Sequence, residues 1–260
     1  MNGKKKQPAP PAAAEALRFA EAIEAAHAHE AARGGIGTLG EKTLHAVLKY
    51  YLEPDDAFHE VKCGRYVADI LRDGRITEIQ TRSFDHLRAK LAAFLPDYDV
   101  TVVYPLAKVK FVRWIDPADG SVSPPRRSPK SWTVHEAFWE LNKIRAYLKD
   151  PHLHIRFLFL ELTEYRMLDG WSHDKKRGST RFDREPAAVL DDLTIRRAGD
   201  FASLIPQTLV SPFTAKDYAK EAHVDISRAR QAISLLVYLG LLRETGKSGR
   251  CKLYSFSDKE

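Results

Sequence analysis

The 260-residue sequence has little cysteine and no long apolar run. Cys63 and Cys251 lie far apart and show no metal-ligand spacing, and the ten histidines are scattered, so neither a disulfide framework nor a zinc site is indicated. No apolar stretch approaches the roughly 18 residues of a membrane span. The first residues contain no apolar signal segment. These absences predict a reduced, cytoplasmic protein with no membrane partner.

The charge balance favours a polyanionic partner. Lysine and arginine together number 41, against 35 aspartates and glutamates, which gives a net charge of +6. Hydrophobic residues make up 44% of the chain and charged residues 29%, as in ordinary folded domains. An excess of positive charge suits a nucleic acid but does not identify one. The length allows a catalytic-size domain together with a smaller second one.

Composition divides the chain into three parts. Residues 1–13, a lysine run followed by prolines, are expected to be a disordered basic tail. Residues 14–195 are expected to form the larger domain, and residues 199–260 a smaller C-terminal domain. The larger domain should begin with a helix over 14–33, which packs through a stripe of Leu17, Ala20 and Ile23.

The order of local patterns predicts an α/β (α+β) domain with a mixed sheet flanked by helices. A two-residue period over 58–81 indicates a hairpin, and the apolar segment 154–163 indicates a buried strand. The remaining expected elements are helices at 39–52, 85–95, 133–148 and 186–192, one or two strands over 98–115, and a loop over 116–131.

The hairpin carries the main chemical signal. Asp73-Gly74 is a strong two-residue turn sequence, and counting outward from it places Asp69 directly opposite Glu78. Gln80 projects from the same face as Glu78. Two facing carboxylates destabilise a strand pair unless a cation lies between them or one takes up a proton. Hard oxygen ligands at this spacing suit Mg²⁺, which takes one or two carboxylates with waters and phosphate oxygens.

A solvated hairpin face is the alternative reading of these charges. Three observations weigh against it. The flanking stretches YVADIL and ITEIQT are too apolar for an exposed edge. Glu41 stands at the start of the preceding helix, and a helix with basic residues follows at once (Arg82, Arg88, Lys90).

Glu41, followed by the hairpin residues Asp69, Glu78 and Gln80 and then a helix, resembles the PD-(D/E)XK nuclease superfamily over roughly residues 36–115, and on to 163. The resemblance implies a restriction-endonuclease-like α-β-β-β-α-β core. It also implies that Asp69 and Glu78 hold Mg²⁺ (or Mn²⁺), with Glu41 assisting. The sequence departs from the family at two positions: Ala68 replaces the usual proline, and the uncharged Gln80 replaces the usual lysine, which can stabilise negative charge.

Basic residues elsewhere in the larger domain are candidate phosphate contacts. Trp132 and Trp171 interleave with them and could stack on bases. The alternative is that these are solvated loops with tryptophans packed in the core. The candidates are Lys110, Arg126, Arg127, Lys130 and Arg166, with further basic residues over 165–184.

The C-terminal part resembles bacterial winged-helix transcription factors. Helix candidates over 199–209, 214–222 and 226–239 precede two short strands around a basic Gly-containing loop. By that resemblance, the last of these helices reads DNA and the loop forms a basic wing. Winged helices also serve as protein-interaction modules, which stays open. The expected nucleic-acid contacts here are Arg228, Arg230, Gln231, Lys247 and Arg250.

Together these features predict a metal-dependent DNA endonuclease with a winged-helix DNA-binding module, acting on duplex or branched DNA. A non-catalytic DNA-binding regulator with a nuclease-like scaffold and an RNA-processing nuclease are the alternatives. Cleavage of both strands would need two such sites, which a homodimer would supply.

Overall fold

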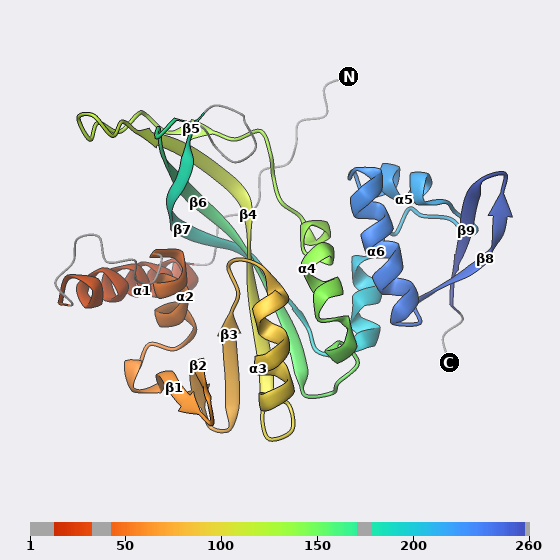
Figure 1. Cartoon of the computed structure of the whole chain (residues 1–260), viewed down its shortest axis with the longest axis horizontal. Helices are drawn as coiled ribbons and strands as arrows, with labels where there is room; N and C mark the ends of the chain where they lie inside the picture. The colour runs from red at the N-terminus through yellow and green to blue at the C-terminus, as the bar shows by residue number, and fades with distance from the viewer. Residues whose placement is uncertain (1–12, 33–42, 171–177, 258–260) are drawn as a thin grey trace. The chain divides into compact units, whose positions relative to one another are not determined.

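The structure is a computed structural model that describes residues 13–32, 43–170 and 178–257 (Figure 1). Chain contacts divide it into two compact units, each built from three segments. The first unit contains residues up to His59, Pro105–Trp132 and Leu158–Asp192, and the second contains Glu60–Tyr104, Thr133–Phe157 and Leu193–Glu260. The three-part division expected from composition stays a prediction.

The fold is mixed α/β, as expected, and its larger sheet has the strand order β1-β2-β3-β4-β6-β7, with β5 paired to β4 beside this path. β2 and β3 are antiparallel whereas β3 and β4 are parallel, so the sheet is mixed. β8 and β9 form a separate antiparallel pair. The strands are β1 (His59–Cys63), β2 (Tyr66–Arg72), β3 (Arg75–Ile79), β4 (Asp99–Ile115), β5 (Arg126–Arg127), β6 (Leu153–Met167), β7 (Thr180–Ile195), β8 (Leu242–Ser248) and β9 (Cys251–Phe256).

The β2–β3 hairpin confirms the register predicted from its turn. Asp73 and Gly74 adopt φ of 50° and 72°, the left-handed pair that a type I′ turn requires. Arg72 therefore pairs with Arg75 and Ile70 with Thr77. Four of the flanking apolar residues are buried, so the hairpin is no solvated edge, although Val67 is 47% exposed; the four are Ala68, Ile70, Ile76 and Ile79.

A short helical crossover, η2 (Phe84–His86) and α3 (Leu87–Phe94), joins the parallel strands β3 and β4. α3 buries Leu87, Leu91 and Phe94, which recur at helical spacing. Phe84 is fully buried and meets the ring of Tyr104 edge-on, with centroids 5.0 Å apart. The crossover is therefore held on the sheet by a continuous apolar contact.

The helices α1 (Ala13–Ala32) and α2 (Thr43–Leu52) belong to the first unit. α1 corrects the expected stripe: Leu17 is 62% exposed, and the buried side chains are Phe19, Ala22 and Ala26. Phe19 decides this face because its ring packs edge-on against Tyr51 of α2, 5.2 Å away.

Two further expectations about local structure were wrong or incomplete. Residues 186–192 form part of strand β7 and not a helix. Pairing with β6 overrides the helical propensity of Ala187 and Ala188, and Pro186 is tolerated in a strand at the end of the sheet order. The expected helix over 133–148 is three short pieces, η3 (Val134–Glu136), α4 (Phe138–Lys143) and η4 (Arg145–Tyr147).

The C-terminal segment, residues 193–260, contains η5 (Ala198–Leu204), α5 (Ala215–Glu221), α6 (Ile226–Tyr238) and the β8–β9 hairpin. The expected helix over 199–209 is thus a short 3₁₀ turn, whereas the next two helices and two strands lie where predicted. Thr214 and Asp217 form a capping box on α5, and Asp225 caps α6 by accepting the Arg228 N–H. Within the described ranges, no helix is long and apolar enough to cross a membrane.

Candidate functional site

Asp69 and Glu78 meet across the β2–β3 hairpin. Asp69 Oδ2 accepts the backbone N–H of Ile79 at 2.7 Å, and Glu78 Oε1 accepts the N–H of Asp69 at 3.3 Å. Each carboxylate is thus fixed by the backbone of the opposite strand. The predicted approach of the two carboxylates is confirmed.

Lys90 of α3 supplies the cation at this pair. Its Nζ lies 2.7 Å from Glu78 Oε2, while Glu78 itself is 2% exposed. Burial, and next the charge of Asp69, raise the pKa of Glu78 to about 7, against the lowering effect of Lys90. The site therefore holds two carboxyl groups, Asp69 and Glu78, and one ammonium group, Lys90. The Glu78 carboxyl group titrates near neutral pH.

This pKa makes folding stability depend on pH. The folded protein holds a proton on Glu78 up to about pH 7, whereas an ordinary glutamate releases it near 4.5. The contribution of Glu78 to the free energy of unfolding is therefore full at acid pH and falls as the pH rises from about 4.5 to about 7. In the Glu78→Gln variant, we expect the free energy of unfolding no longer to fall over this pH range. Urea unfolding of both proteins at acid and alkaline pH measures it, and an equal decline in the two proteins would contradict the assignment.

Gln80 is tied to the loop that follows β3. Its Nε2 donates to the carbonyl of Ser83, and its backbone N–H donates to Val103 O at 2.9 Å. The loop is in turn held by α4, because Glu140 accepts the Phe84 N–H at 2.7 Å and Lys143 donates to Ser83 Oγ at 2.6 Å. The orientation of Gln80 thus depends on helix α4.

The donor set at the hairpin fits a hard divalent cation in chemistry but is small. Two carboxylates with hard oxygens are what Mg²⁺ takes together with waters and phosphate oxygens. Among the described residues, no group of three or more His, Cys, Asp or Glu side chains converges as a metal site. Glu41, the expected third acid, lies outside the described residues, as do Trp171 and the basic residues 175–177.

The basic candidates of the larger domain separate into paired and exposed groups. Lys110 and Arg166 both lie within ion-pair distance of Glu164. Arg126, Arg127 and Lys130 are exposed, the first two on β5.

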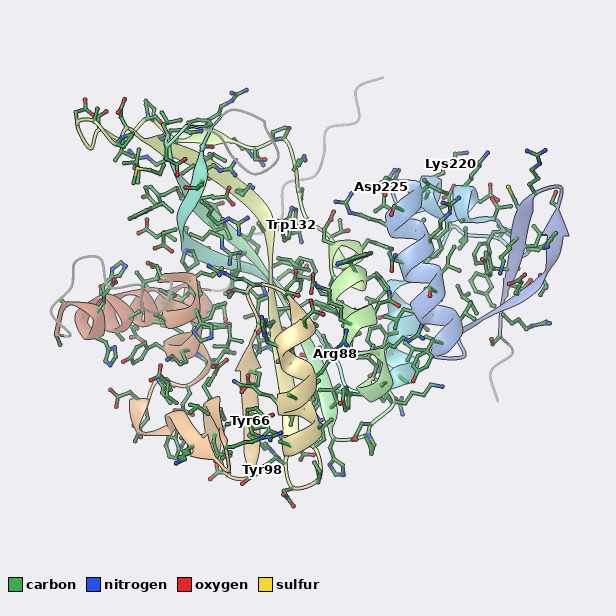
Figure 2. The ribbon with its side chains drawn as sticks, viewed as in Figure 1. Tyr66, Arg88, Tyr98, Trp132, Lys220 and Asp225 are labelled. Carbon is green, nitrogen blue, oxygen red and sulfur yellow. The ribbon has the colours of Figure 1, made fainter. Side chains whose placement is uncertain are left out.

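Two residues of the expected DNA-contacting set on helix α6 contact other residues of the protein, although Arg228 itself is exposed. Arg228 Nε lies 2.6 Å from Glu136 Oε2, and its Nη1 contacts Asp225. Asp225 lies at the N-terminal end of α6 (Figure 2). Asn142 of α4 donates to the backbone carbonyl of Gln231 at 3.0 Å. Arg230 is exposed, and so are the hairpin residues Lys247 and Arg250.

Three residues of this site were not identified as site residues from the sequence: Lys90, Glu140 and Lys143. The helical pattern of α3 held a signal for Lys90, since a residue three positions after Leu87 lies on the buried face. Nothing local signals Glu140 and Lys143, which reach the loop after β3 from more than 50 residues away.

The class defined by these observations is a mixed α/β protein with a paired-carboxylate hairpin. Residues 42–196, more than half of the chain, match the family described as Domain of unknown function (DUF8091). The chain belongs to this family. It is also 28% identical, over 220 residues, to a protein described as uncharacterized from Treponema pallidum (strain Nichols), covering 84% of this chain and 86% of that protein. No solved structure matches it.

Proposed function

We propose that the protein is a metal-dependent nuclease of the PD-(D/E)XK type, acting on DNA. The observation that carries this proposal is the cross-strand meeting of the half-buried Asp69 with the buried Glu78, whose carboxylate also contacts Lys90. A purely structural hairpin has little reason to place a buried acid opposite a second, half-buried one, because the like charges repel and the buried acid loses hydration.

Each residue has a role under this proposal. Asp69 and Glu78 would hold Mg²⁺ or Mn²⁺, which would supply a water of lowered pKa and neutralise charge on the attacked phosphate. Lys90, which contacts the Glu78 carboxylate, would provide the ammonium that Gln80 lacks and would donate to the water or a phosphate oxygen. Gln80, held through Ser83, orients groups by hydrogen bonding. Glu78 must be ionised to bind metal, so cleavage should rise with pH through about 7.

Removing the Lys90 charge should reduce cleavage. We expect Lys90→Gln to lower kcat on the order of 10²-fold, as for loss of one charge-stabilising donor. Because Lys90 lowers the pKa of Glu78, its loss should also move the rising limb of the pH profile to higher pH. Single-turnover cleavage across pH measures both effects, with a substitution at an exposed residue of β1, Lys62→Gln, as the control.

A second variant restores an ammonium at position 80, where the PD-(D/E)XK superfamily usually has lysine, and so sharpens this test. Gln80→Lys in the Lys90→Gln protein should recover part of the lost rate, because the charge returns to the same site. An unchanged kcat and pH profile in Lys90→Gln would exclude a role for Lys90 in the reaction.

The C-terminal segment is proposed as a winged helix. Three helical segments followed by a two-stranded hairpin support this, with α6 in the place of the DNA-reading helix. Since Arg228 is paired with Glu136 and Asp225, the contacts to DNA would come from Arg230, Lys247 and Arg250.

The proposal is tested by incubating the protein with supercoiled and branched DNA and with structured RNA, in Mg²⁺, Mn²⁺ or a chelator. Metal-dependent cleavage of DNA is expected. Cleavage of RNA alone would favour the RNA-processing alternative. Absence of both cleavage and metal binding by titration calorimetry would overturn the catalytic proposal.

A second candidate is a non-catalytic DNA-binding regulator. The Lys90–Glu78 ion pair favours it, because an internal cation already compensates one carboxylate without metal. This candidate predicts DNA binding that is equal with and without Mg²⁺, and no cleavage product.

A further inference from the structure

Glu164 lies near the C-terminal end of β6 and contacts three cationic side chains from three strands. It is 4% exposed. Its Oε2 lies 3.3 Å from Arg181 Nε on β7 and 3.6 Å from Lys110 Nζ on β4, and its Oε1 lies 3.5 Å from Arg166 Nε. All four residues belong to the first compact unit. They are called the Glu164 cluster below.

The Glu164 cluster carries more positive than negative charge. Three cations around one carboxylate leave a net charge of +2 among these four side chains. A neighbouring pair shows the ordinary balance: Lys108, two residues earlier on β4, lies 3.0 Å from Asp191 as one cation with one carboxylate. Like charges held together repel, and an anion placed among them relieves this repulsion.

The cations are partly accessible but positionally restrained. Lys110, Arg166 and Arg181 have side-chain exposures of 19%, 37% and 48%. Arg166 Nε is buried without a hydrogen-bond partner, its distance to Glu164 being an ion-pair contact only. Glu164 contacts Arg166 and Arg181 through their Nε atoms. The terminal nitrogens, Nη1 and Nη2, of both guanidinium groups are therefore the atoms that can bind a ligand.

An exposed basic residue continues this surface on the next strand. The backbone N–H of Ser128 donates to Lys110 O at 2.7 Å, which places the end of β5 beside Lys110. Arg126, which is exposed, pairs with Val112 of β4, and Val112 lies on the same face of the sheet as Lys110 because side chains alternate along a strand. Arg126 therefore extends the positive charge from β4 onto β5, as an extended polyanion would require.

We propose that the Glu164 cluster binds the phosphodiester backbone of the nucleic acid, with Glu164 holding the three cations in position. The choice of nucleic acid as the polyanion rests on the proposed function. Guanidinium groups match phosphate oxygens in a two-pronged geometry, and contacts to phosphate carry no base sequence. The sequence suggested Lys110, Arg166 and Arg181 only as separate basic residues; the structure brings them together around the buried Glu164, to which it gives a positioning role.

Binding should be measured with the full chain carrying Asp69→Asn, so that cleavage does not interfere. Labelled duplex DNA, single-stranded DNA and duplex RNA of about 20 units, titrated at several salt concentrations, give the affinity and its salt slope. We expect Lys110→Gln, Arg166→Gln and Arg181→Gln each to weaken binding about 5–10-fold and to reduce the salt slope by about 1. Lys108→Gln, the matched control, should change affinity less than twofold.

Glu164→Gln distinguishes a built site from diffuse charge. It raises the net charge, so a diffuse surface would bind more tightly; loss of the positioning carboxylate should instead weaken binding. Thermal unfolding of Glu164→Gln identifies any loss of folding, and the three cation variants test the site independently of it. Equal effects of Lys108→Gln and the cluster variants, or no effect of either, would overturn the proposal.

The DNA and RNA probes decide which backbone the cluster prefers. Cluster-dependent binding without metal-dependent cleavage by the unsubstituted protein would support the cluster and refute the nuclease. If cleavage and binding are both unchanged in the cluster variants, the nuclease proposal is supported and the proposal for the Glu164 cluster is refuted.

Discussion

Replacing Asp69 with Asn is expected to abolish metal-dependent cleavage, with a loss on the order of 10³-fold or more. Asn keeps the size of the side chain and can still accept the Ile79 N–H through its oxygen, so the hairpin should stay folded. It removes one of the two negative charges that would hold the metal. Cleavage rates and Mg²⁺ titration of both proteins measure the effect.

Asp69→Asn should also lower the pKa of Glu78, an effect that unfolding of the variant would not produce. The charge of Asp69 contributes to the raised pKa of Glu78, so its removal should lower that pKa from about 7. The decline of stability with pH should then become smaller. Metal-dependent cleavage by Asp69→Asn at the unsubstituted rate would show that the hairpin is not the catalytic site.

The second large effect concerns stability. Phe84→Ala is expected to lower the free energy of unfolding by about 3–5 kcal/mol, because the fully buried ring leaves a cavity against Tyr104. Val210→Ala is the control, since Val210 is 77% exposed and should change stability by less than about 0.5 kcal/mol. Urea denaturation of the two variants and the parent protein gives these values.

Phe84→Ala should also disturb the candidate site. The Phe84 N–H donates a hydrogen bond to Glu140. The preceding residue, Ser83, accepts hydrogen bonds from the side chains of Gln80 and Lys143. Displacement of this loop should therefore lower kcat even under conditions where the variant is fully folded. Phe84→Leu, which fills most of the cavity, should recover most of the stability and show whether loss of activity follows loss of packing.

The sequence was most informative where local chemistry decides the structure. The Asp73-Gly74 turn needs two positive φ angles, which sets the strand pairing and so brings Asp69 opposite Glu78. Likewise, the helix expected over 226–239 is α6, whose Asp225 cap and buried side chains act within a few residues. In each case the interaction that selects the conformation spans only a short stretch of chain.

Where pairing with a distant strand or ring outweighs propensity, the sequence misled. β7 was expected to be a helix in part, yet hydrogen bonding in the sheet makes it extended. The buried face of α1 was misplaced because Tyr51 selects Phe19. Neither partner can be found by periodicity within the segment itself.

The approach of Asp69 to Glu78 was thus determined by the sequence, through the turn that joins their strands. The compensating charge of Lys90, the hold of Lys143 on the loop after β3 and the convergence of three cations on Glu164 were decided only by the tertiary structure. The physical reason is range. Turn and cap preferences act over a few residues, whereas these ion pairs join side chains that only the assembled sheet and helices bring within reach.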